Sequence, residues 1–98
     1  MSQFAASVAD HHRPDIACFS VQARAEPGVM PRVLELFAKR GLVPSSWQSS
    51  TCGADRSRLT IDIEMRGLGH ETVDYIAACL RQIVFIEIVS TARGPAPG

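Results

Sequence analysis

The sequence predicts an α+β sandwich in which two helices cover one face of a four-stranded antiparallel sheet. Polar and apolar residues alternate along several segments, at the period of a strand with one solvated face. Two other segments carry the apolar stripe of an amphipathic helix. Turn residues separate these segments, and the resulting order, β-α-β-β-α-β, is that of a ferredoxin-like domain with two right-handed crossovers.

The first strand and the first helix follow directly from these patterns. Residues 16–24 predict a strand, because Phe19, Val21 and Ala23 alternate with the neighbouring residues from Cys18 to Arg24. Residues 29–40 place their apolar side chains on one arc of a helical wheel and predict a helix. Pro31 falls in the first turn, where a missing N–H removes no intrahelical hydrogen bond. Gly41 is expected to end the helix, because glycine readily adopts a positive φ.

The remaining elements differ in the strength of their signal. Residues 42–51 contain Pro44 and four serines, which favours a weak second strand at a sheet edge. Residues 59–65 give the clearest strand alternation in the chain. Residues 73–83 predict the second helix, with His70 near its start, and residues 84–91 predict the last strand.

Alternation also assigns the two faces of the last strand. Val84, Ile86 and Ile88 are expected to face the helices, and Phe85, Glu87 and Val89 the open side of the sheet. Trp47 lies in the expected edge strand. Trp47, Phe85 and Val89 are then large apolar side chains without cover in a monomer, and we expect them at an interface.

Length and charge limit the organisation and the partners. A chain of 98 residues is expected to form one domain, 15–92, between disordered tails at 1–14 and 93–98. The formal net charge is zero and no basic run occurs, so nucleic acid is not an expected partner. The sequence shows neither a secretory signal nor a membrane-spanning stretch, which predicts a cytoplasmic protein without membrane contact.

The cysteines and histidines do not form a recognisable metal site. Three cysteines occur, at Cys18, Cys52 and Cys79, an odd number without a Cys-x-x-Cys pair, and we expect free thiols. His11 and His12 follow Asp10 in a polar segment that offers no fourth ligand. No metal site is therefore predicted.

No set of residues in the sequence converges on catalysis. Asp62 and Glu64 are expected on the open sheet face, where solvated carboxylates are ordinary. Acylphosphatases of this topology need an arginine-bearing phosphate loop after the first strand, and residues 25–28 offer a carboxylate instead. Metal carriers of this fold need Cys-x-x-Cys in the same loop, and the sequence lacks it. RNA binders need aromatic residues on the middle strands, where the sequence offers only Phe19, which is expected to face the helices. A small enzyme of this topology is therefore the least favoured reading.

The loop before the first helix is the best candidate for a binding site. The amides of Gly28, Val29 and Met30 open the helix and, with its dipole, would bind a carboxylate or another anion. Gly28 would let such a ligand approach the backbone closely. The alternative is that Glu26-Pro27-Gly28 is only a strand-to-helix turn.

At this loop the sequence resembles a known family. The run Glu26-Pro27-Gly28-Val29-Met30-Pro31-Arg32-Val33-Leu34-Glu35-Leu36-Phe37-Ala38-Lys39-Arg40-Gly41-Leu42 resembles the signature of ACT domains, the ligand-sensing modules of amino acid metabolism. The run Leu80-Arg81-Gln82-Ile83-Val84-Phe85-Ile86-Glu87-Ile88-Val89 is similar to a segment of one branch, the regulatory small subunits of acetohydroxyacid synthase. Arg58-Leu59-Thr60-Ile61 resembles the start of that branch's third strand.

The resemblance implies an effector site between two protomers. It consists of Ala25, Glu26, Gly28, Val29 and Met30 of one protomer with Val43 and Pro44 of its neighbour. Feedback-sensitive small subunits carry asparagine at the positions of Ala25 and Val43, and neither alanine nor valine can hydrogen-bond an amino acid. The resemblance therefore implies weak or absent feedback by valine.

The same resemblance implies a function and its alternative. A single domain resembles the short subunits of the isozyme II type of the synthase. It implies a non-catalytic activating subunit that binds the large thiamine-diphosphate-dependent catalytic subunit and holds no cofactor itself. The alternative is a free-standing ACT homodimer that senses an amino acid without any synthase.

Overall fold

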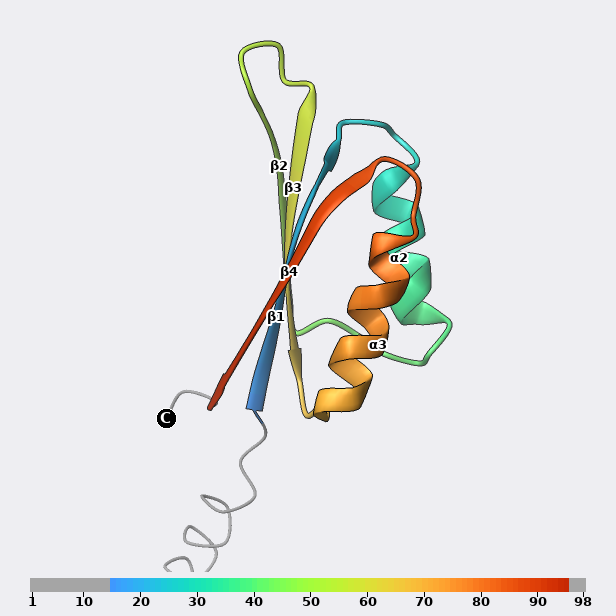
Figure 1. Ribbon diagram of the computed structural model, residues 1–98, viewed down its shortest axis with the longest axis vertical. Coiled ribbons are helices and arrows are strands. Elements are labelled where there is room, and N and C mark those ends of the chain that lie inside the picture. The colour runs from blue at the N-terminus through green and yellow to red at the C-terminus, as the bar shows by residue number, and fades with distance from the viewer. Residues whose placement is uncertain (1–14, 96–98) are drawn as a thin grey trace, which may run out of the picture.

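The computed structural model describes residues 15–95 and confirms the predicted sandwich, with two helices against one face of an antiparallel sheet (Figure 1). The elements are β1 (Asp15–Arg24), α2 (Val29–Ala38), β2 (Ser46–Cys52), β3 (Arg58–Arg66), α3 (His70–Arg81) and β4 (Ile86–Pro95). The sheet order is β2-β3-β1-β4, so β2 and β4 are its edges. Within the described residues no helix is long and apolar enough to cross a membrane.

The core lies between the sheet and the helices and confirms the faces predicted for the two central strands. The apolar residues that alternate along β1 and β3 are buried: Ala17, Phe19, Val21, Ala23, Leu59, Ile61, Ile63 and Met65. The rings of Phe19 and Phe37 meet edge to face, with centroids 5.8 Å apart. Strict alternation therefore located the core face correctly where the strands are regular.

The end of α2 follows the sequence prediction. Gly41 has a φ of +68°, a conformation that an L-residue adopts at a cost. Its amide donates to the carbonyl of Ala38 at 2.9 Å, and the amide of Leu42 donates to that of Phe37 at 3.0 Å. These two bonds form a Schellman motif, which satisfies carbonyls that the helix leaves without partners.

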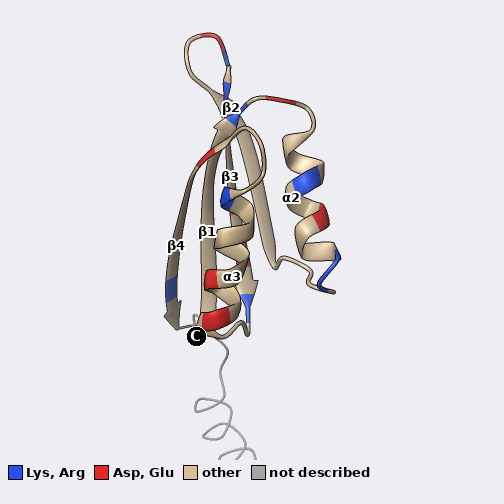
Figure 2. Cartoon of the chain, turned by 45° about the vertical axis from the view of Figure 1, so that its right-hand side comes forward, with Lys and Arg blue, Asp and Glu red and all other residues tan. Residues whose placement is uncertain are grey.

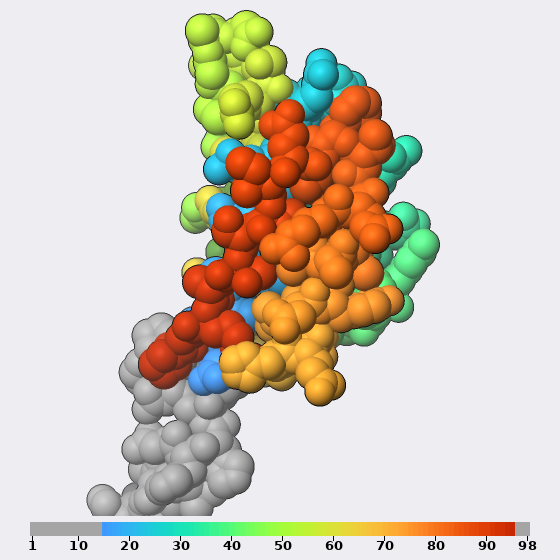
Figure 3. Space-filling model, viewed as in Figure 1, coloured from blue at the N-terminus to red at the C-terminus, as the bar shows by residue number. Residues whose placement is uncertain are grey.

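The edge strand β2 begins later than predicted. Residues 42–45 form a loop, because Pro44 has no N–H to donate to a sheet ladder. Ser45 starts the pairing by donating its amide (2.8 Å) and its hydroxyl (3.0 Å) to the carbonyl of Glu64. Figure 3 shows the hairpin between β2 and β3 projecting past the loop that joins β1 to α2.

The faces predicted for β4 are wrong beyond its first residues. The register against β1 shifts between Gln22 and Ala23, so that Ile86 lies opposite Ala23 and Ile88 opposite Gln22. Such a bulge adds a residue to one strand and exchanges the faces that follow it. Val89 is consequently 6% exposed and part of the core, whereas Ile88 is 48% exposed.

The last strand also extends further than predicted. Arg93, Gly94 and Pro95, which the sequence analysis assigned to the tail, pair with β1. Proline is tolerated there because β4 is an edge strand that pairs on one side only. Arg93 donates to the carboxylate of Asp15 at 3.1 Å. Figure 2 shows that β4 carries charged residues only near its two ends. Residues 1–14, with Asp10, His11 and His12, and residues 96–98 lie outside the described residues.

Candidate functional site

The loop that joins β1 to α2 is held by the neighbouring hairpin. The amide of Ala25 donates to the carbonyl of Ser57 at 2.8 Å. Gly28 is the N-cap of α2, with φ −79° and ψ −7°, which any residue adopts, and no side chain caps the helix. No atom lies within 4 Å of the place where a Cβ on Gly28 would stand. Glycine is therefore not needed for the turn, and it leaves the backbone open to a ligand.

The helix start offers fewer free amides than the sequence predicts. The amide of Val29 donates to the carbonyl of Glu26 at 3.1 Å, within the loop itself. The side chain of Val29 is fully buried in the core, so it is not available for contact with a ligand. The Glu26-Pro27-Gly28 segment thus forms a strand-to-helix turn, and Val29 does not offer a free amide to the predicted anion site.

A small cavity of about 160 Å³ opens beside this loop. It is lined by Ala25, Glu26, Pro27 and Met30 of the loop and helix, with Thr51 of β2 and Leu59 of β3. Sites for small ligands usually enclose roughly 300–1,000 Å³. The cavity that one chain forms is therefore smaller than such sites, and its lining is mostly apolar. Thr51 and Leu59 were missed in the sequence, since only the hairpin geometry brings them to the loop.

The other predicted site residues lie elsewhere. Val43, 84% exposed, and Pro44 follow the far end of α2. The ten residues of α2 span about 15 Å. Figure 1 shows the loop before β2 at the opposite end of the helix from the loop after β1. A single chain does not bring these two groups of residues together.

The three predicted interface residues have different surroundings. Trp47 lies opposite Ile63 and packs, half buried, against the core, so it is not uncovered as predicted. Val89 belongs to the core. Phe85 precedes β4 and is 41% exposed. Phe85 alone of the three has the exposed apolar surface that the sequence analysis predicted.

The open sheet face places the Cys18 thiol near two carboxylates. Cys18 lies opposite Glu64 on this face. Burial raises the pKa of the Cys18 thiol, and the carboxylates of Glu64 and Asp62 raise it further. The thiol is therefore held in its protonated, unreactive form. Within residues 15–95, no cluster of histidine, cysteine and acidic side chains could hold a metal ion.

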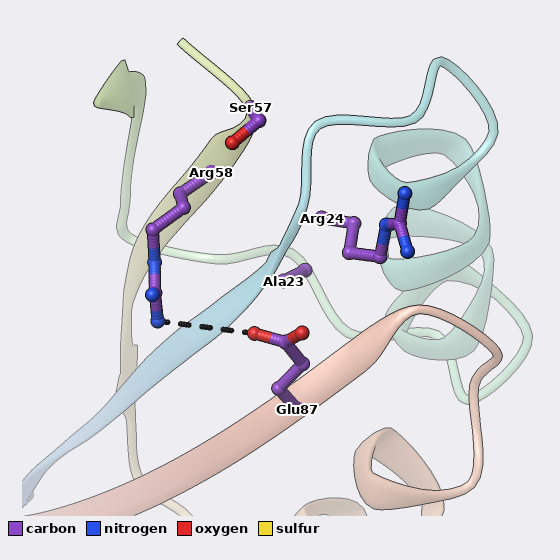
Figure 4. A pocket seen from close by; sticks show the side chains of 5 residues that line it. All are labelled: Ala23, Arg24, Ser57, Arg58 and Glu87. Atoms are coloured by element: carbon purple, nitrogen blue, oxygen red, sulfur yellow. Dashed lines mark ion pairs between the residues drawn. The ribbon is translucent and has the colours of Figure 1, made fainter. Parts of the chain in front are cut away.

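A second cavity, of about 260 Å³, lies where β1, β3 and β4 meet the hairpin (Figure 4). It is lined by Ala23, Arg24, Ser57, Arg58 and Glu87. Arg24 and Arg58 are direct cross-strand partners, an unfavourable pairing of like charges. Arg58 points toward Glu87, 3.8 Å away, and Arg24 points away from this pair. Sequence reasoning missed this cluster, because its members come from three strands.

Comparison with known proteins identifies the family. A family model described as an ACT-like domain matches residues 10–95. The chain belongs to this family. A search of curated protein sequences gives no match.

Solved structures of similar fold include an ACT domain and a regulatory subunit. The ACT domain from GTP pyrophosphokinase of Chlorobium tepidum superposes with a TM-score of 0.68 at 10% identity, over 81% of this chain and 99% of that chain. The C-terminal domain of the MgtC protein from Mycobacterium tuberculosis gives 0.66 at 14% identity, over 85% and 90%. The regulatory subunit of aspartate kinase from Thermus flavus gives 0.63 at 16% identity, over 80% of this chain and 51% of that chain.

Proposed function

We propose that this ACT-like domain is a non-catalytic regulatory subunit that works as a homodimer. The observation that carries the proposal is the division of the candidate effector site. The loop with Ala25 and Met30 lies at one end of α2, and Val43 with Pro44 follows the other end. A second copy related by a two-fold axis is the simplest way to bring the two groups together.

The free edge of β2 is the surface on which the two copies would pair. An edge strand exposes unpaired N–H and C=O groups that another strand can meet. The residues Gln48–Cys52 are exposed and carry no charge that would oppose pairing. Trp47, half buried in one chain, would become more deeply covered at this edge.

Sedimentation at tens of micromolar is expected to show a dimer. Ser49→Lys should give a monomer, because it places a charge on the middle residue of the β2 edge. The matched control is Ser90→Lys, on the opposite edge strand, which should leave the dimer intact. A monomeric parent chain would contradict the proposal, and a dimer lost only in Ser90→Lys would assign the interface to β4.

We further propose that the regulated enzyme is the large subunit of acetohydroxyacid synthase. The support is the resemblance of residues 26–42, 58–61 and 80–89 to its small subunits. Co-expression with the large subunit encoded nearest to this chain should give a complex that survives size exclusion. The complex should be more active than the large subunit alone.

A free-standing amino acid sensor is the second candidate. It is favoured by the same divided site, which a homodimer completes without any synthase. A dimer that binds an amino acid but neither binds nor activates the large subunit would support this candidate and reject the first. The absence of a large-subunit gene beside this one would point the same way.

A further inference from the structure

The turn between α3 and β4 has a backbone conformation that its residue does not favour. The amide of Ile86 donates to the carbonyl of Ile83 at 3.2 Å, which closes a turn with Val84 and Phe85 at its two central positions. Phe85 has a φ of +76°. Glycine or asparagine is the usual residue at such a position, because a side chain on a residue with positive φ is strained. Folding of the domain alone does not explain a phenylalanine here.

The same turn presents apolar surface to solvent. Val84 is 54% exposed, Phe85 41% and Ile88, on the adjoining end of β4, 48%. Three of the six exposed large apolar side chains among the described residues thus lie within five positions. A strained residue beside exposed apolar surface is typical of a binding site, where the energetic benefit comes from the bound partner.

Arg24 adds a cation to this surface. Its guanidinium carbon lies 5.9 Å from the centre of the Phe85 ring, and its amide donates to the carbonyl of Phe85 at 3.0 Å. The nearby Glu87 is directed at Arg58 (Figure 4). Within the part of the chain that the structure describes, no carboxylate lies within ion-pair distance of Arg24. The ring therefore positions a cation that has no ionic partner in residues 15–95.

We infer that this turn is a docking site for the enzyme that the domain regulates, which would bind Phe85 in an apolar pocket with a carboxylate on its rim for Arg24. The inference rests on the proposed regulatory function but not on which enzyme is regulated. The charge of Arg24 favours a different protein over a second copy of this chain as the partner at the turn. A second copy docked about a two-fold axis through the turn would bring Arg24 of one protomer toward Arg24 of the other, and these like charges repel. An acidic surface on a different protein would instead attract Arg24.

The first test uses the isolated chain and needs no partner. Phe85→Gly relieves the strain at φ +76° and removes a side chain that lies outside the core and is 41% exposed. We expect the midpoint of urea unfolding to be unchanged or raised. A clear fall in the midpoint would show that Phe85 is needed by the fold itself and would overturn the inference.

The second test measures binding to the synthase large subunit by calorimetry. Phe85→Gly is expected to weaken binding at least about 30-fold, as for a central aromatic anchor. Arg24→Gln should weaken it about tenfold and make it less sensitive to salt. The controls Leu34→Ala and Arg32→Gln, exposed positions on α2, should bind like the parent. Parental binding by both Phe85→Gly and Arg24→Gln would overturn the inference.

The oligomeric state separates the remaining outcomes. If Phe85→Gly or Arg24→Gln converts the dimer to a monomer, the occupant is a second copy and the inference is wrong. If the parent chain does not bind the large subunit, the proposed enzyme is wrong, and the unfolding test still decides whether Phe85 serves the fold.

Discussion

Val89→Asp is expected to unfold most of the domain, whereas Ile88→Asp should leave it folded. Val89 is 6% exposed and opposite Val21 in the core. A carboxylate there loses its hydration inside the core, which costs several kcal/mol, and the nearby guanidinium of Arg81 already donates to the backbone carbonyl of Val89 at 2.9 Å. A small domain has only about 5–15 kcal/mol of stability in total. Ile88 points to the open face, where aspartate is solvated and the cost should stay within about 1 kcal/mol.

Urea unfolding followed by circular dichroism distinguishes the two variants. Strict alternation from residue 84 onward would give the reverse order of stabilities, with Ile88→Asp the damaging change. The comparison therefore tests the bulge directly. Val89→Ala and Ile88→Ala serve as matched controls without a charge, and the same order is expected with smaller differences.

The bulge shows where sequence reasoning stops for this chain. Along β3 and from Phe19 onward in β1, apolar and polar residues alternate, so that one register alone buries the apolar set. In β4, Ile88 and Val89 are consecutive apolar residues, so the sequence alone is compatible with either of them facing the core. The turn at Phe85 and the extra residue opposite Gln22 and Ala23 determine that Val89 faces the core. Both are tertiary features.

Local chemistry predicted the ends of the helices better than those of the edge strands. Gly41 ends α2 as expected, because its positive φ is required by hydrogen bonds among its own neighbours. The C-terminal limit of β4 depends instead on how far β1 extends beside it. β1 begins at Asp15 and gives Arg93, Gly94 and Pro95 a partner, although their sequence resembles a tail.

The candidate site was predictable only where it is contiguous in sequence. The motif at Glu26-Pro27-Gly28 located the loop, and the loop does border a cavity. Thr51 and Leu59 were missed because the register of the hairpin places them there. The Arg24 cluster was missed for the same reason, since its charges come from β1, β3 and β4.

Changing Ala25→Asn together with Val43→Asn is expected to create valine binding where the parent has little or none. The parent lacks polar side chains at both positions, and an ammonium group buried without acceptors costs several kcal/mol. A hydrogen bond to a charged group contributes about 1.5–3 kcal/mol, so each substitution should tighten binding at least about tenfold. Calorimetric titration with valine, leucine and isoleucine measures this. Micromolar binding by the parent would contradict the expectation.

The division of the site between two copies makes a sharper version of this experiment possible. Residues 25 and 43 lie at opposite ends of α2, so the two substituted side chains of one chain cannot both contact the same ligand. Chains with Ala25→Asn alone and chains with Val43→Asn alone should each bind valine weakly. After the two are mixed and allowed to exchange subunits, one of the two sites in every mixed dimer carries both substitutions. Tight binding that appears only in the mixture would locate the site between protomers. If the mixture binds no better than the separate variants while the double variant binds tightly, both substitutions must be in the same chain and the two-fold arrangement through β2 is wrong.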